Sequence, residues 1–155
     1  MDSVWFNPDE EDTLCLSPFW VFSSLIGRHR GLDDVDLTIL IRCVERASDA
    51  PGELVFEILD TFRRQTERLA GLYENDTRPV SAGLSDVAIL LVRASRSEAQ
   101  LFRDMLVGRL GVLIATAKGP FGRSADLEDL QRLQLLPVFL EAPDIRPFPT
   151  ARVVA

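Results

Sequence analysis

The chain has 155 residues, 46% of them hydrophobic and 26% charged, a composition that fits one globular domain and excludes wholesale disorder. Its formal net charge of −7 argues against a nucleic-acid-binding protein, because phosphate recognition needs a surplus of lysine and arginine on one face. Cys15 and Cys43 are too few for a disulfide framework or a thiolate metal site, so we expect two buried, reduced thiols in a cytoplasmic protein. Neither a signal peptide nor a membrane span is predicted.

The first two predicted elements are helices. Asn7-Pro8 indicates a turn, and the acidic run from Asp9 to Asp12 suits the first turn of a short helix. Ser17-Pro18 predicts the start of a second helix, with Ser17 as its N-cap. Residues 19–26 are apolar around most of the helix circumference, which is typical of a helix at the centre of a bundle. We expect this helix to end near Gly27 or Gly31.

The middle of the chain predicts three further helices. Apolar residues recur at spacings of three and four over Asp33–Ala47 and over Glu53–Tyr73, with charged residues between them. Asn75 to Pro79 then forms a loop. Val80–Ala94 is predicted to be helical, although the continuous apolar run from Val87 to Val92 also fits a buried strand.

A long helix is predicted to begin at Ser97-Glu98 and to reach Ala117. Lys118 to Gly122 breaks it, and a last helix is predicted from about Ala125 to just before Pro137. We therefore predict an all-α fold, a single-domain helical bundle of about six or seven helices over residues 1–140, followed by a proline-containing C-terminal tail over residues 141–155. A loose similarity between Gly31–Val35 and Gly83–Val87 suggests two related helical halves.

Residues of conventional catalytic centres are scarce in this sequence. His29 is the only histidine, and it lies between Arg28 and Arg30, a setting that disfavours its protonation. The sequence has no glycine-rich phosphate loop and no zinc-protease motif. We therefore expect a protein without enzymatic activity.

Two acidic segments are candidates for divalent-metal binding. Asp33, Asp34 and Asp36 follow the second helix, and closely spaced carboxylates can supply the oxygen ligands that Ca²⁺ or Mg²⁺ requires. The same residues fit a helix start, with Asp33 as N-cap and the other two favoured by the helix dipole, and we favour this interpretation. The later segment, with Ser124, Asp126 and Glu128, has the same two interpretations: a second acidic site, or a helix capped by Ser124.

The order of several segments points to a known family. Pro18 to Ser23 (PFWVFS), the loop and helix start from Gly27 to Leu37, the stretch Arg78 to Val87 and the stretch Glu98 to Gly119 occur in this order. Together with the acidic helix that follows from Asp126, they resemble the tellurite-resistance TerB-like family of small helical bacterial proteins. The resemblance spans most of residues 5–140.

This resemblance implies an all-α fold of two related halves and a role in bacterial stress or chemical defence, near the inner face of the membrane and with no assigned reaction. It also implies acidic loops that bind a divalent metal ion such as Ca²⁺, Mg²⁺, Mn²⁺ or Zn²⁺. The implied metal ligands in this sequence are Asp33, Asp36, Asp126 and Glu128. The chain departs from the family pattern at His29, where the family has an acid, and at Asp36, where the family has glutamate.

Two functional hypotheses follow from the sequence. The first is a non-enzymatic TerB-like module that interacts with a protein partner and binds a divalent metal at its acidic loops. The second is a helical interaction protein without a ligand, which forms a homodimer through Trp5, Phe6 and the Pro147-Phe148-Pro149 segment, because aromatic residues beside prolines often dock on a partner.

Overall fold

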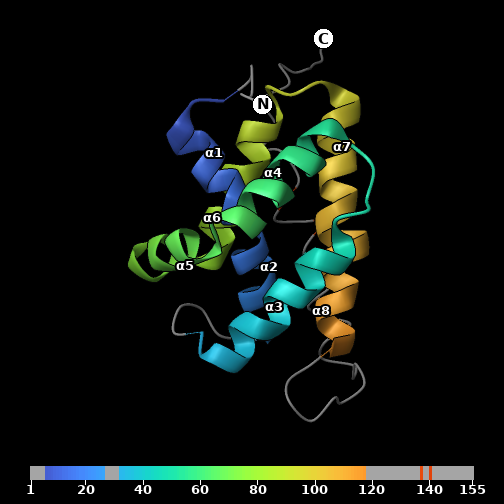
Figure 1. Cartoon of the computed structure of the whole chain (residues 1–155). Helices are drawn as coiled ribbons and strands as arrows, with labels where there is room; N and C mark the ends of the chain where they lie inside the picture. Colours follow the sequence, from blue (N-terminus) through green and yellow to red (C-terminus); the bar gives the residue numbers. More distant parts are fainter. Residues whose placement is uncertain (1–5, 27–31, 118–136, 138–139, 141–155) are drawn as a thin grey trace.

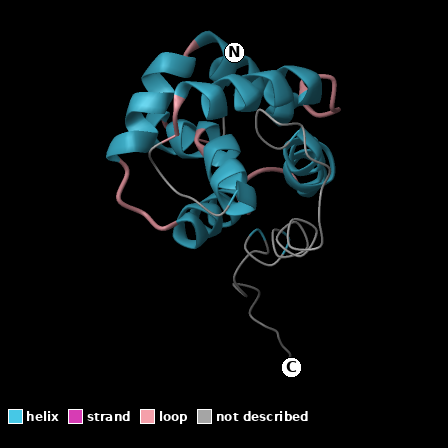
Figure 2. Ribbon diagram, turned by 90° about the horizontal axis from the view of Figure 1, so that it is seen from below, coloured by secondary structure: helices cyan, strands magenta, loops and turns pink. Residues whose placement is uncertain are grey.

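The computed structural model describes residues 6–26, 32–117, 137 and 140, and Figure 1 shows their arrangement. The elements are α1 (Pro8–Cys15), α2 (Ser17–Ile26), α3 (Asp34–Ala47), α4 (Glu53–Arg64), α5 (Thr66–Asn75), α6 (Val80–Leu91), α7 (Arg96–Asp104), the π-helical segment η1 (Met105–Gly111) and α8 (Val112–Ala117). The described residues contain no strand (Figure 2), so the prediction of an all-α bundle is confirmed, and Val80–Leu91 is a helix. None of the helices in this part of the chain is long and apolar enough to cross a lipid bilayer.

Helix α2 forms the centre of the bundle, as its apolar circumference predicts. Phe19, Trp20 and Phe22 are almost completely buried, and Cys15 and Cys43 are buried near them as free thiols. Because every side of α2 is apolar, it can be covered all round, and it packs on α1, α3, α6, η1 and α8. Removing these large apolar side chains from water contributes to the hydrophobic driving force for folding.

The start of α2 differs from the prediction. Leu16 alone separates α1 from α2, and Ser17 is the first residue of α2. Its hydroxyl donates to the carbonyl oxygen of Leu14 at 2.6 Å, so the prediction that Ser17 is an N-cap acceptor is wrong. The N-cap of α1 is Asn7, which exchanges hydrogen bonds with Glu10 in a capping box.

The segment from Glu53 to Tyr73 is two helices, so the prediction of one continuous helix is wrong. The break lies at Gln65, where the Thr66 hydroxyl donates to the carbonyl oxygen of Phe62 at 2.7 Å. Thr38 makes the same kind of bond to Asp34 within the unbroken α3, so this bond alone does not account for the break. Helix α5 buries Tyr73, which stacks on Phe19 with ring centroids 4.9 Å apart.

The helix predicted from Ser97-Glu98 to Ala117 begins slightly earlier and is not uniform. Its N-cap is Ser95, which accepts from the backbone N–H of Glu98. The Glu98 carboxylate in turn accepts from the N–H of Leu54 at 2.9 Å, and so caps α4, whose own N-cap residue is Gly52. Figure 1 shows α7, η1 and α8 as one continuous column.

Near the C-terminus, Pro137 and Leu140 are helical. The residues immediately before Pro137 lie outside the described part of the chain, so the expected end of the last helix before Pro137 stays a prediction. The break at 118–122, the start of the last helix at Ala125 and the tail 141–155 lie outside the described residues.

Gly83 is the fourth residue of α6 and lies against the indole ring of Trp20. A Cβ atom at position 83 would lie closer than 3.0 Å to three ring carbons of Trp20, a separation that real Cβ atoms essentially never show. The nearest of these carbons, Cε2, is bonded to three ring atoms, so it can be approached this closely only over the face of the ring. Glycine is therefore required here for the α6 backbone to reach the indole.

The position of Gly83 in α6 also tests the internal repeat that the sequence suggests. Gly83–Val87 lies inside α6, whereas Asp33 is the N-cap of α3 and Asp34 its first residue. The two similar segments therefore occupy different structural positions, and their similarity does not support two related halves.

We predict that Gly83→Ala lowers the free energy of unfolding by about 2 kcal/mol or more, because the added methyl group must displace the indole ring. The matched control is Gly71→Ala in α5, where nothing lies within 4 Å of the Cβ position. This control should raise stability by up to about 1 kcal/mol through helix propensity. Urea unfolding measures both, and equal stability of Gly83→Ala and the parent protein would contradict the packing described.

Candidate functional site

The acids predicted to bind metal at the start of α3 form its N-terminal cap. The Asp33 carboxylate accepts from the N–H of Asp36 at 2.8 Å, and the Asp36 carboxylate accepts from the N–H of Asp33 at 3.4 Å. This capping box satisfies two backbone N–H groups that the helix leaves without a partner. The structural interpretation of Asp33 is confirmed.

The metal prediction itself stays untested. Within the described residues, no group of three or more histidine, cysteine, aspartate or glutamate side chains is placed to hold a metal ion. Asp126, Glu128 and Ser124 lie outside the described residues, as does His29. The structure therefore places two of the four implied ligands, and both already accept hydrogen bonds from the backbone.

Substitutions at Asp33 separate capping from metal binding. Asp33→Ala should lower the free energy of unfolding by about 1 kcal/mol, whereas Asp33→Asn should leave it nearly unchanged, because asparagine is an equally good N-cap. Urea unfolding measures these values, and calorimetric titration with Ca²⁺, Mg²⁺, Mn²⁺ and Zn²⁺ measures binding. If Asp33→Asn were as unstable as Asp33→Ala, the capping role would be contradicted. Titration heat that the parent protein shows and both variants lose would show that the carboxylate is a metal ligand.

A groove of about 560 Å³ follows the outer side of α3 and ends at α8. We call it the α3 groove; it is lined by Asp34, Val35, Thr38, Ile39, Arg42, Cys43, Arg46 and Ala117. The seven α3 residues recur at spacings of one, three and four, which places them on one face of the helix. Figure 1 shows α3 beside α8, the two helices that supply the lining residues of the groove.

The α3 groove has an apolar floor. Ile39 and Ala117 are half-buried, Cys43 is 3% exposed, and Val35 is 47% exposed. Burial raises the pKa of the Cys43 thiol, so this thiol is protonated at neutral pH and is a poor nucleophile. The groove therefore offers apolar contact surface and not thiol chemistry.

The charged residues of the groove have no ion pair within the described part of the chain. Elsewhere, Arg68, Arg93 and Arg109 each form a salt bridge with a carboxylate from a different segment. Asp34, Arg42 and Arg46 form none with other described residues, and all three are exposed. Asp34 lies at the N-terminal end of the groove and the two arginines at its C-terminal end, so the charge changes sign along its length.

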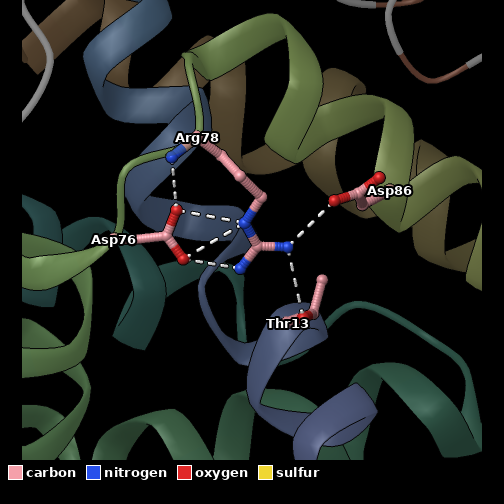
Figure 3. A network of polar contacts seen from close by, with 4 residues as sticks. All are labelled: Thr13, Asp76, Arg78 and Asp86. Atoms are coloured by element: carbon pink, nitrogen blue, oxygen red, sulfur yellow. Dashed lines mark hydrogen bonds and ion pairs between the residues drawn. The ribbon is translucent and has the colours of Figure 1, made fainter.

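A second polar feature is the cluster around Arg78 (Figure 3). The guanidinium donates to the Asp76 carboxylate at 2.6 Å and 3.0 Å, and to Asp86 at 3.0 Å. It also lies 4.8 Å from the centre of the Trp20 ring and 3.5 Å from the Thr13 hydroxyl oxygen. Hydrogen bonds to Asp76, and secondarily to Asp86, raise the pKa of Arg78.

The Arg78 cluster borders a small cleft of about 270 Å³, lined by Asn7, Asp9, Glu10, Thr13, Arg78, Asp86, Ile89 and Leu90. Most of the polar groups here already serve the fold. Glu10 caps Asn7 and pairs with Arg93, and these hydrogen bonds lower its pKa. Arg78 is held by Asp76 and Asp86 from the loop before α6 and from α6 itself. The arrangement joins α1, α6 and the loop over Trp20, and we interpret it as structural.

A double-mutant cycle tests this interpretation. Asp76 is 14% exposed and Asp86 44% exposed, so water screens the Arg78–Asp86 pair more strongly. The coupling free energy should be about 1.5 kcal/mol for Arg78→Gln with Asp76→Asn, and below about 0.5 kcal/mol for Arg78→Gln with Asp86→Asn. Equal couplings in urea unfolding would contradict this order.

Comparison with protein-family models, with curated proteins and with solved structures found no match to this chain. The resemblance to the TerB-like family, and the stress or defence role that it implies, therefore stay predictions from the sequence.

Neither the α3 groove nor the Arg78 cluster is directly indicated by the sequence. The signal for the groove was present: Val35 and Ile39 lie four residues apart and outside the buried stripe of Leu40 and Val44. A second apolar strip of this kind on an amphipathic helix indicates a surface for another element. For the homodimer surface predicted at Trp5, Phe6 and residues 147–149, only Phe6 is described, and it is 7% exposed and covered by Arg93.

Proposed function

We propose that this protein is a non-enzymatic helical module that binds a polypeptide segment along the α3 groove. The observation that carries the proposal is the combination of an apolar floor with charged side chains that have no ion pair in the described part of the molecule. An interface with an apolar centre, flanked by arginine, is typical of protein recognition sites.

The chemistry of the groove defines its partner. A bound segment needs apolar side chains to cover Val35 and Ile39, and acidic side chains beside Arg42 and Arg46. Near Asp34 it needs a basic group, because this end of the groove is negatively charged. An amphipathic helix fits this description, since its apolar and charged side chains can follow one face over the length of α3.

Divalent-metal binding at Asp33, Asp36, Asp126 and Glu128 is not part of this proposal. Asp33 and Asp36 accept hydrogen bonds from each other's backbone, which gives both acids a role without an ion. The capping box positions the first turn of α3, and with it Asp34 and Val35 at the end of the groove.

Site-specific photo-crosslinking in the cells that naturally make the protein tests the proposal. A benzoylphenylalanine in place of Val35 should form a covalent adduct with a polypeptide, because this side chain is exposed at the groove. The matched control is the same photoreactive residue in place of Phe56 on α4, which is 62% exposed and does not line the groove.

We expect an adduct from position 35 and none from position 56, with the captured polypeptide identified by mass spectrometry. The absence of any adduct at position 35, or equal adducts at both positions, would contradict binding at the α3 groove.

A further inference from the structure

We propose that the segment bound at the α3 groove is α3 of a second copy of this chain, packed antiparallel around a two-fold axis. This inference rests on the proposed function and adds the identity of the partner. It predicts a homodimer formed through α3, and not through the Trp5, Phe6 and 147–149 surface predicted from the sequence.

The charge pattern of α3 is complementary to itself when one copy is reversed. Asp34 and Arg42 lie at equal distances from Thr38, four residues or about 6 Å along the helix axis. A two-fold axis near Thr38 therefore places Asp34 of one copy beside Arg42 of the other, and the symmetry repeats this pair. Arg46 lies one turn further along and extends the positive end of the same face.

The apolar residues fit the same arrangement. Val35 and Ile39 lie on either side of Thr38, close to the proposed axis, so they would meet the corresponding face of the second copy at the centre of the contact. Val35 is 47% exposed in a single copy, and pairing would remove this surface from water. The result is an apolar centre with ion pairs at both ends, which is the usual anatomy of an interface.

The overall charge of the protein makes this local pattern more significant. Each copy carries a net charge of −7, so two copies repel at a distance. A contact between copies is therefore most favourable where exposed arginines concentrate, and Arg42 and Arg46 lie together on the groove without a described carboxylate partner. One helix pair is a small contact, so we expect a reversible dimer whose population depends on protein concentration.

Charge reversal tests the proposal with the full-length chain. Asp34→Arg makes the charged residues of the groove all positive, and the pair Arg42→Glu with Arg46→Glu makes them all negative. Each change acts twice in a symmetric dimer, so each variant alone should self-associate at least about tenfold more weakly than the parent protein. An equimolar mixture of the two variants should restore association as a heterodimer. Sedimentation equilibrium measures the masses, and Förster transfer between labelled variants reports the mixed dimer.

The control is Glu74→Arg, a charge reversal on the exposed surface of α5 outside the groove, which should leave dimerisation unchanged. Circular dichroism checks that each variant is folded, and the milder pair Arg42→Gln with Arg46→Gln provides a second test if a reversal unfolds the chain. These neutral substitutions should also weaken self-association.

Two results would overturn the inference. The parent protein could remain monomeric at every concentration tested, or it could dimerise with a dissociation constant that neither charge reversal changes. If position 35 nevertheless crosslinks to a different polypeptide, the proposed function stands and only the second copy is excluded. If position 35 crosslinks to nothing, both proposals fail.

Discussion

The face of the Trp20 indole rests on the backbone of α6 at Gly83, and the arrangement of the bundle depends on this contact. Close packing of this kind leaves no room for a side chain, so it fixes both the distance between α2 and α6 and the orientation of the ring. Because α2 is buried on all sides, the helices around it take their positions from it: α6 and η1 pack on it directly, and α5 reaches it through the stacking of Tyr73 on Phe19.

The polar groups near Trp20 follow from the same constraint. Arg78 precedes α6, and its guanidinium lies over the indole ring in a cation–π contact. Its hydrocarbon stem is apolar and suits the same apolar surroundings. Asp76 and Asp86 hold the guanidinium in that position from two sides (Figure 3). Carboxylates are common in catalytic and metal sites, but these two bind the Arg78 guanidinium and so join the loop before α6 to α6 itself. The outer face of α3 is different, because its charged residues are not used by the described part of the fold.

Much of the fold could be predicted from the sequence, because it depends on local signals. The apolar circumference of α2 predicted its burial, and Asp33 predicted the start of α3 together with its cap. The break at Gln65 could not be predicted, because no glycine or proline marks it in the sequence. The need for glycine at position 83 could not be predicted, because the Trp20 ring that requires it is distant in sequence. The groove depends on which face of α3 the other described helices leave uncovered, and only the packed structure determines that.

The core is thus fixed by one close contact between the Trp20 ring and the α6 backbone. The proton NMR spectrum of Gly83 tests this contact directly. A proton above an aromatic ring is shielded by the ring current, so one Hα of Gly83 should resonate well upfield of its random-coil position and show a nuclear Overhauser effect to the Trp20 indole. Both Hα protons at ordinary glycine positions, without that effect, would show that α6 does not rest on the ring and would contradict the arrangement described.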